Sequence, residues 1–169
     1  MVKYKIIDNF LEEEDFKNLY NLITGPNQFH WYLNETVGTD NDSNKSHFYF
    51  CHRMYEGDKP ISNYFYELSN IWKAFTKNNY KIKTMIRCKA NLYTRTPEII
   101  EHTMHTDFDF EHIGALFSLN TCDGYTLLED GTKINSVANR MLIFDASKKH
   151  ASTTCTNQNT RMNINFNLF

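Results

Sequence analysis

The spacing of apolar residues changes near Tyr80, and this change constrains the fold more than any other feature. Before it, apolar residues recur with the period of an α-helix, whereas from Ile82 to Tyr93 apolar and polar residues alternate one by one. Such alternation places the two sets of side chains on opposite faces of a strand. The sequence therefore predicts helices first and a β-rich half second, with a long strand whose two faces differ chemically.

Further strand-like runs follow, separated by turn signals such as Asp123-Gly124 and Asp130-Gly131. We expect these strands at residues 114–120, 125–129, 133–136, 140–145 and 161–169. Many short strands between turns predict a mainly β protein, an antiparallel sandwich or jelly roll, with the helices buttressing one face.

The pattern of the first half predicts two amphipathic helices separated by a long polar stretch. One helix is expected over 12–24, with an acidic first turn, and another from Pro60 to Lys77. Between them, residues 34–46 contain few apolar side chains, and we expect a mobile lid there. At 169 residues the chain has the length of one domain, divided into a helical buttress with active-site loops (1–79) and a jelly-roll core (80–169).

Composition excludes several classes of protein. Eighteen basic against twenty acidic residues give a net charge of −2, which argues against a nucleic-acid partner. No apolar run approaches twenty residues, and nothing at the start resembles a signal peptide, so we expect a cytoplasmic protein with no membrane partner. The four cysteines form no C-x-x-C pair. Oligomeric state is not predicted.

The chemistry concentrates in the β-rich half. His105 and Asp107 are one residue apart, so an extended strand would place both on one face, where they could hold one ion. Taken alone, this pair also fits a surface histidine beside a solvated carboxylate. His150 follows a later strand, and two imidazoles with one carboxylate form the ligand set of non-haem Fe(II) oxygenases. Arg161, eleven residues further on, could pair bidentately with the distal carboxylate of 2-oxoglutarate.

Four motifs occur in order: H-T-D, N-x-x-D-G-Y-T, F-D-A-S-x-x-H and R-M-N-I-N-F. Together they resemble the 2-oxoglutarate/Fe(II)-dependent dioxygenases, most of all short phage and marine-bacterial members of the prolyl-hydroxylase-like branch. The resemblance covers about residues 80–169 and implies a double-stranded β-helix, a distorted jelly roll. It implies Fe(II) bound by His105, Asp107 and His150, and 2-oxoglutarate bound by Arg161 and Tyr93, with O2 as the second cosubstrate.

The same resemblance implies an enzyme that hydroxylates an unactivated C–H bond, with a small-molecule or peptide substrate such as a prolyl residue. Alternatives are an oxygenase acting on a free amino acid or a nucleic acid, and a catalytically silent jelly-roll binding protein. One departure is Ser118, where many relatives have a second tyrosine.

Neighbouring residues have plainer interpretations. We expect His102 and His112 in surface or packing roles and Asp109 in solvent. Asn163 and Asn165 share the strand parity of Arg161 and could face the interior. The aromatic residues of the loop-rich stretch from Trp31 to Tyr55 either pack beneath a long loop or bind the substrate. If they bind the substrate, Arg53 and Arg87 are candidate contacts for an anionic group.

Overall fold

The computed structural model describes residues 4–26, 29–37 and 48–169. Its helical elements are α1 (Glu13–Thr24), the 3-10 helix η1 (Asn63–Leu68) and α2 (Ser69–Lys77). Its strands are β1 (Tyr4–Ile7), β2 (Tyr32–Asn34), β3 (Tyr49–Glu56), β4 (Lys59–Pro60), β5 (Met85–Thr94), β6 (Ile113–Ser118), β7 (Tyr125–Leu128), β8 (Lys133–Asn135), β9 (Arg140–Asp145), β10 (His150–Ser152) and β11 (Thr160–Leu168).

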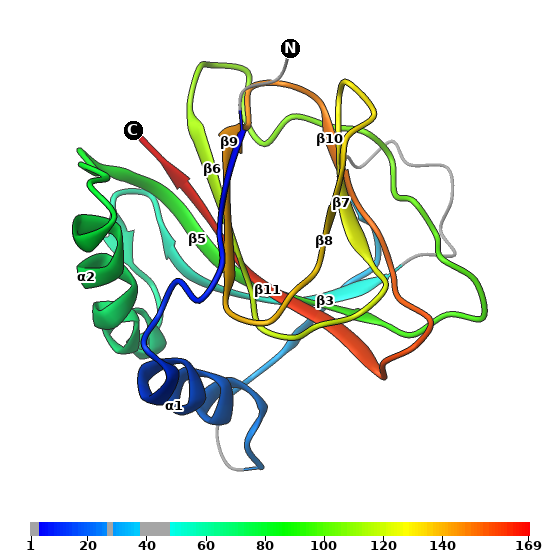
Figure 1. Ribbon diagram of the computed structural model, residues 1–169, viewed down its shortest axis with the longest axis horizontal. Coiled ribbons are helices and arrows are strands. Elements are labelled where there is room, and N and C mark those ends of the chain that lie inside the picture. Colours follow the sequence, from blue (N-terminus) through cyan, green and yellow to red (C-terminus); the bar gives the residue numbers. More distant parts are fainter. Residues whose placement is uncertain (1–3, 27–28, 38–47) are drawn as a thin grey trace.

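Two antiparallel sheets face each other (Figure 1). The larger has the order β1-β9-β6-β11-β5-β3-β2, with β4 paired to β3, and the smaller has the order β10-β7-β8. Strands distant in sequence are neighbours in space, as in a jelly roll. The predicted fold class, mainly β with supporting N-terminal helices, is confirmed.

Helices α1 and α2 lie outside the large sheet, at the left of Figure 1. Their apolar sides pack on the sheet through aromatic rings: Trp72 and Phe75 of α2 lie 5.3 Å and 6.3 Å from Phe166 of β11, between ring centres. Phe10, which precedes α1, makes an edge contact with Phe75 at 5.1 Å. This packing covers one face of the large sheet and leaves the opposite face turned toward the smaller sheet.

The opposite face of β5 and β11 is polar. On β5, Cys88 and Ala90 belong to the core beneath the helices, whereas their neighbours point between the two sheets. The inward-facing residues are directly opposed across the two strands, in the pairs Tyr93–Arg161, Asn91–Asn163, Lys89–Asn165 and Arg87–Asn167. The two-faced strand expected from the sequence therefore separates a hydrophobic core from a polar interior.

Several local expectations were wrong. The helix expected from Pro60 is a 3-10 helix followed by α2, because the 3.6 period of its apolar residues does not resolve these two forms over so few turns. The strand expected from Ile82 begins at Met85. Strand β3 lies in a stretch expected to be loop-rich. Most of the expected lid over 34–46 lies outside the described residues.

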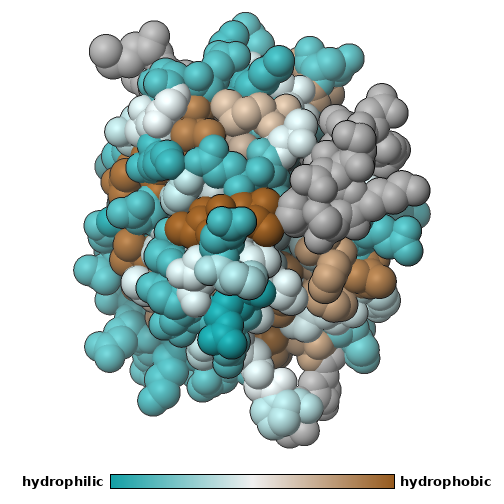
Figure 2. Space-filling model, turned by 90° about the vertical axis from the view of Figure 1, so that its right-hand side faces the viewer, coloured by the Kyte–Doolittle hydropathy of each residue, from teal (hydrophilic) through white to brown (hydrophobic). Residues whose placement is uncertain are grey.

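The face at the right of Figure 1 is largely hydrophilic, with apolar side chains confined to separate patches (Figure 2). Within the described residues, no helix has the length and apolar character needed to cross a membrane.

Candidate metal centre

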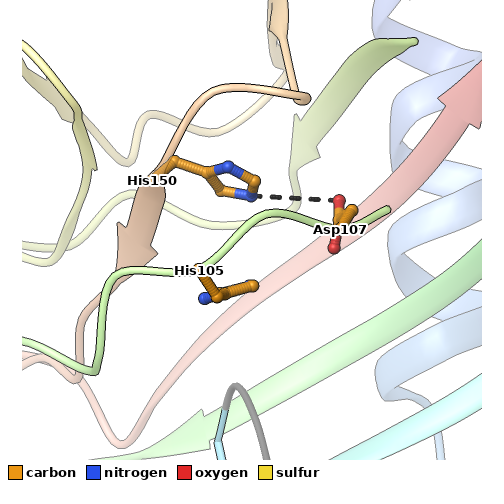
Figure 3. Close-up of side chains that lie close together, drawn as sticks. All are labelled: His105, Asp107 and His150. Atoms are coloured by element: carbon orange, nitrogen blue, oxygen red, sulfur yellow. Dashed lines mark ion pairs between the residues drawn. The ribbon is translucent and has the colours of Figure 1, made fainter. Parts of the chain in front are cut away.

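Three potential metal ligands converge between the sheets (Figure 3). Each of His105, Asp107 and His150 offers a ligand atom, and these atoms all lie within 4.8 Å of one another. His150 begins β10, and its backbone exchanges two hydrogen bonds of 2.9 Å with His105. This bridge holds the two rings 4.9 Å apart, centre to centre.

The segment around Asp107 differs from the sequence expectation. His105 forms a β-bridge, but Asp107 lies in an irregular segment rather than on a regular strand. Its carboxylate is directed inward by side chains of the neighbouring large sheet, so the convergence does not depend on strand parity. His150 Nε2 lies 3.8 Å from Asp107 Oδ2.

Backbone carbonyls fix the orientation of both rings. His105 Nδ1 lies 3.0 Å from the carbonyl of Thr103, and His150 Nδ1 lies 3.0 Å from that of Lys148. A carbonyl only accepts hydrogen bonds, so each Nδ1 carries the proton and each Nε2 keeps its lone pair. This is how metal-binding imidazoles are usually held. Burial also lowers the pKa of His150, which favours the neutral, ligating form.

Asp107 is kept ionised by its neighbours. Burial is the largest single influence and by itself would raise its pKa. Several neighbours, with the cation of Arg87 first among them and the hydrogen bond from Asn167 included, together outweigh burial and hold the pKa of Asp107 well below its usual range. Arg87 Nη2 donates to Oδ1 at 2.8 Å, while Asn165 and Asn167 donate to Oδ2 at 3.2 Å and 2.8 Å. The carboxylate is therefore anionic and oriented before any metal arrives.

Arg161 is a buried cation with no counter-ion in the described part of the chain. Its side chain is only 1% exposed. Nη1 donates to the carbonyl of Thr153 at 3.2 Å and Nη2 to Thr126 Oγ1 at 3.0 Å, while Nε has no partner. The guanidinium lies 5.6 Å from the centre of the Tyr93 ring, and burial lowers the pKa of Arg161. A buried charge of this kind is costly unless an anion joins it.

No protein-family model and no curated protein matches the sequence. Solved structures do match. A viral collagen prolyl hydroxylase from Paramecium Bursaria Chlorella virus-1, in its 2OG complex, aligns at a TM-score of 0.64 and 14% identity, covering 98% of this chain and 94% of its own. A 2OG-Fe(II) oxygenase family oxidoreductase from Burkholderia pseudomallei aligns at 0.70 and 11% identity, covering 98% and 84%.

A third match is a prolyl hydroxylase from Trichoplax adhaerens, in complex with a peptide fragment of the hypoxia inducible factor oxygen degradation domain. It aligns at a TM-score of 0.64 and 17% identity, covering 98% of this chain and 83% of its own. The chain has the 2OG-Fe(II) oxygenase fold. Because one fold hosts many functions, the function has to be argued from the residues of the polar interior described above.

A cavity of about 50 Å³ joins the triad to Arg161 within this oxygenase fold. That volume suits a metal ion with a few waters, so a larger ligand requires wall side chains to move. Lys89, on the wall, has this freedom because it makes no hydrogen bond within the described residues. The sequence interpretation did not single out Lys89, although it shares strand parity with Tyr93. Burial and the charge of Arg87 lower the pKa of Lys89 to about 8.

Other candidate residues lie elsewhere in the oxygenase fold. His102 is buried, with Nδ1 2.8 Å from Ser152 Oγ and its ring against Tyr93, while His112 packs against Phe108. Asp109 is exposed. The remaining anion-contact candidate, Arg53, pairs with Glu56 on the surface.

The aromatic stretch between the helices does not line the metal cavity. His52 lies between the carbonyl of His30 (2.6 Å from Nδ1) and Ser62 Oγ (2.8 Å from Nε2). Its ring contacts Phe29 and Tyr64 at 4.6 Å and 5.3 Å. These contacts are aromatic packing, as in the first of the two interpretations open from the sequence. Tyr32, His52 and Arg53 also line a separate pocket of about 800 Å³, so the second interpretation stays a prediction.

Proposed function

We propose that the protein is a 2-oxoglutarate- and Fe(II)-dependent oxygenase that hydroxylates an unactivated C–H bond. The observation that carries the proposal is the shared cavity: one end holds a His-Asp-His triad, and the other holds a buried arginine that has no counter-ion among the described residues. A metal held by the triad could be chelated by one end of a dicarboxylate, while the arginine pairs with the carboxylate at the other end. The fold is one that 2-oxoglutarate-dependent oxygenases have.

The donor set fits Fe(II). Two imidazoles whose Nδ1 atoms face backbone carbonyls and one ionised carboxylate make three protein ligands, which leaves coordination sites open. In this proposal His105, Asp107 and His150 hold the metal. When bound, Fe(II) supplies the redox chemistry that converts 2-oxoglutarate, O2 and R–H into succinate, CO2 and R–OH.

The role of the protein is to bind, orient and exclude water. Arg161 would pair with the distal carboxylate of 2-oxoglutarate through its planar guanidinium, a geometry that favours Arg over Lys. Tyr93, directly opposite Arg161 in the β5–β11 register, would donate its hydroxyl to the same carboxylate. Burial raises the pKa of Tyr93, so the hydroxyl keeps the proton it needs to donate.

We propose a peptide or a small molecule as substrate, with a prolyl residue as the first candidate. The support is similarity of fold to two prolyl hydroxylases, one of them in complex with a peptide fragment. Ser118 stands where the sequence resemblance leads us to expect a second tyrosine, so cosubstrate contacts from β6 differ. A silent binding protein is disfavoured because it has no use for two inward-facing Nε2 atoms beside an ionised carboxylate.

The test is metal binding and turnover by purified protein. Wild type should bind one Mn(II) or Fe(II) and convert 2-oxoglutarate to succinate slowly even without a substrate. His105→Ala and His150→Ala should lose both properties, because each removes one of three ligands. His30→Ala, an exposed histidine, serves as the matched control. Undiminished succinate formation by either ligand variant would contradict the proposal.

A further inference from the structure

Lys89 is a second cation on the cavity wall. It projects from β5 into the space between the sheets, opposite Asn165 of β11. Its ammonium lies 5.8 Å from the centre of the Tyr49 ring and forms no hydrogen bond or ion pair with any described residue. A lysine buried to this extent is usually paired with an anion, and the Tyr49 ring is not one.

Asp107, whose charge acts on Lys89, forms its ion pair with Arg87 and none with Lys89. Asp107 already accepts from Arg87 on one oxygen and from Asn165 and Asn167 on the other. In the proposed function the same carboxylate also binds the metal. An anion that neutralises Lys89 must therefore come from outside the described chain.

The net charge around the cavity also favours an additional anion. Arg87, Lys89 and Arg161 contribute three positive charges around the cavity, and Asp107 contributes one negative charge. Bound Fe(II) and 2-oxoglutarate carry +2 and −2 and cancel each other. A net charge of +2 then remains in a partly desolvated site, which favours an additional anion.

Lys89 lies far from Arg161, at the other end of the cavity. Arg161 is opposite Tyr93, four residues further along β5, which is about 13 Å at 3.3 Å per residue. Lys89 is instead at the level of Asn165, whose amide touches Asp107, and so it stands beside the metal ligands. This is where the oxidised carbon of a substrate has to lie.

We propose that Lys89 binds a carboxylate of the substrate, so that the enzyme acts on an acid. This inference rests on the proposed function and narrows its substrate class. The carboxylate belongs either to a free amino acid or to an acidic side chain next to the oxidised residue of a peptide. Both sources present the same group to Lys89.

Calorimetry on protein loaded with Mn(II) and 2-oxoglutarate tests the inference. One arm compares free L-amino acids, proline among them, with their primary amides. The other compares capped peptides in which proline is flanked by aspartate or by asparagine. We expect wild type to bind an acid at least about 30-fold more tightly than its neutral partner, the lower bound for losing one member of a buried charge pair.

The variant Lys89→Met keeps the length and apolar stem of the side chain but removes the charge. It should lose the preference for acids over amides, whereas Lys81→Met, an exposed lysine, should keep it. Affinities of both variants for Mn(II) and 2-oxoglutarate should stay within about threefold of wild type. This separates the inference from the proposed function, which fails if the wild type binds neither Mn(II) nor 2-oxoglutarate.

Three results would overturn the inference. The first is wild-type protein that binds amides as tightly as acids, and the second is wild type that binds no acid of either arm. The third is a large loss of 2-oxoglutarate affinity in Lys89→Met, which would assign Lys89 to the cosubstrate instead.

Discussion

Arg87 and Asp107 form a buried ion pair, with Nη2 2.8 Å from Oδ1. Asn167 closes a ring around it, because it accepts from Arg87 Nε at 3.1 Å and donates to Asp107 Oδ2 at 2.8 Å. The guanidinium also lies 4.8 Å from the centre of the Phe108 ring. Asp107 is thus fixed by contacts to β5 and β11 rather than by its own irregular segment.

Removing Arg87 should therefore weaken metal binding. In Arg87→Met the carboxylate of Asp107 loses its partner on Oδ1 and the largest of the nearby charges that lower its pKa, and keeps only the amides of Asn165 and Asn167. We expect Mn(II) affinity to fall about 10- to 100-fold, the usual effect of losing a group that holds a metal ligand. Titration calorimetry measures this directly. Arg53→Met, which removes an exposed arginine, should bind normally, and equal affinity of both variants would show that the ion pair does not position the ligand.

Gly124 makes room for Arg161. A Cβ at this position would lie 2.7 Å from Arg161 Cδ and 2.5 Å from the carbonyl of Thr154, too close in both cases. Gly124→Ala should displace the guanidinium and raise the 2-oxoglutarate dissociation constant at least about tenfold. Gly131→Ala is the matched control: it strains a turn with φ of +84° but has open space around it, so it should cost stability without affecting 2-oxoglutarate.

The Asp8–Arg140 pair connects the end of β1 to the start of β9, with contacts of 2.6 Å and 2.9 Å. Hydrogen bonds from Arg140 lower the pKa of Asp8. The stabilisation is therefore complete above the unfolded-state pKa and disappears as pH falls through the lower folded-state pKa. Because Asp8 is 52% exposed, we expect less than about 1 kcal/mol.

Denaturant unfolding of wild type and Asp8→Asn across pH measures this contribution. The difference between the two should be constant from pH 8 to 6, begin to fall only near the unfolded-state pKa of about 4, and vanish below the lower folded-state pKa of Asp8. A difference that grows on acidification would contradict the assignment of the pair.

The β-rich half was predictable because its apolar periodicity and turn residues agree. Strands β6 to β9 and β11 lie where alternating residues and Asp-Gly turns placed them. Strand β3 was missed because one of its faces covers the helix-side core while the other meets the polar interior. Its sequence, YFCHRMYE, therefore mixes aromatic, polar and charged residues without a clear alternation.

Part of the site could be predicted from residue types and from the strand positions that share a face. Asn163 and Asn165 were expected inside from their parity with Arg161, and both line the cavity. The same parity argument could have found Lys89. The ion pair of Arg87 with Asp107 could not be predicted, since it depends on the path of an irregular segment across the large sheet.

The 2-oxoglutarate titration of Arg161→Leu against wild type tests the central claim most directly. If Arg161 is the partner of the distal carboxylate, the variant should lose about 2–5 kcal/mol of binding, a factor of roughly 30 to several thousand in affinity. Arg161→Lys should recover part of it, because lysine keeps the charge but not the planar fork. Mn(II) affinity should stay near normal in both, as no ligand is changed. An unchanged 2-oxoglutarate titration in Arg161→Leu would contradict the account.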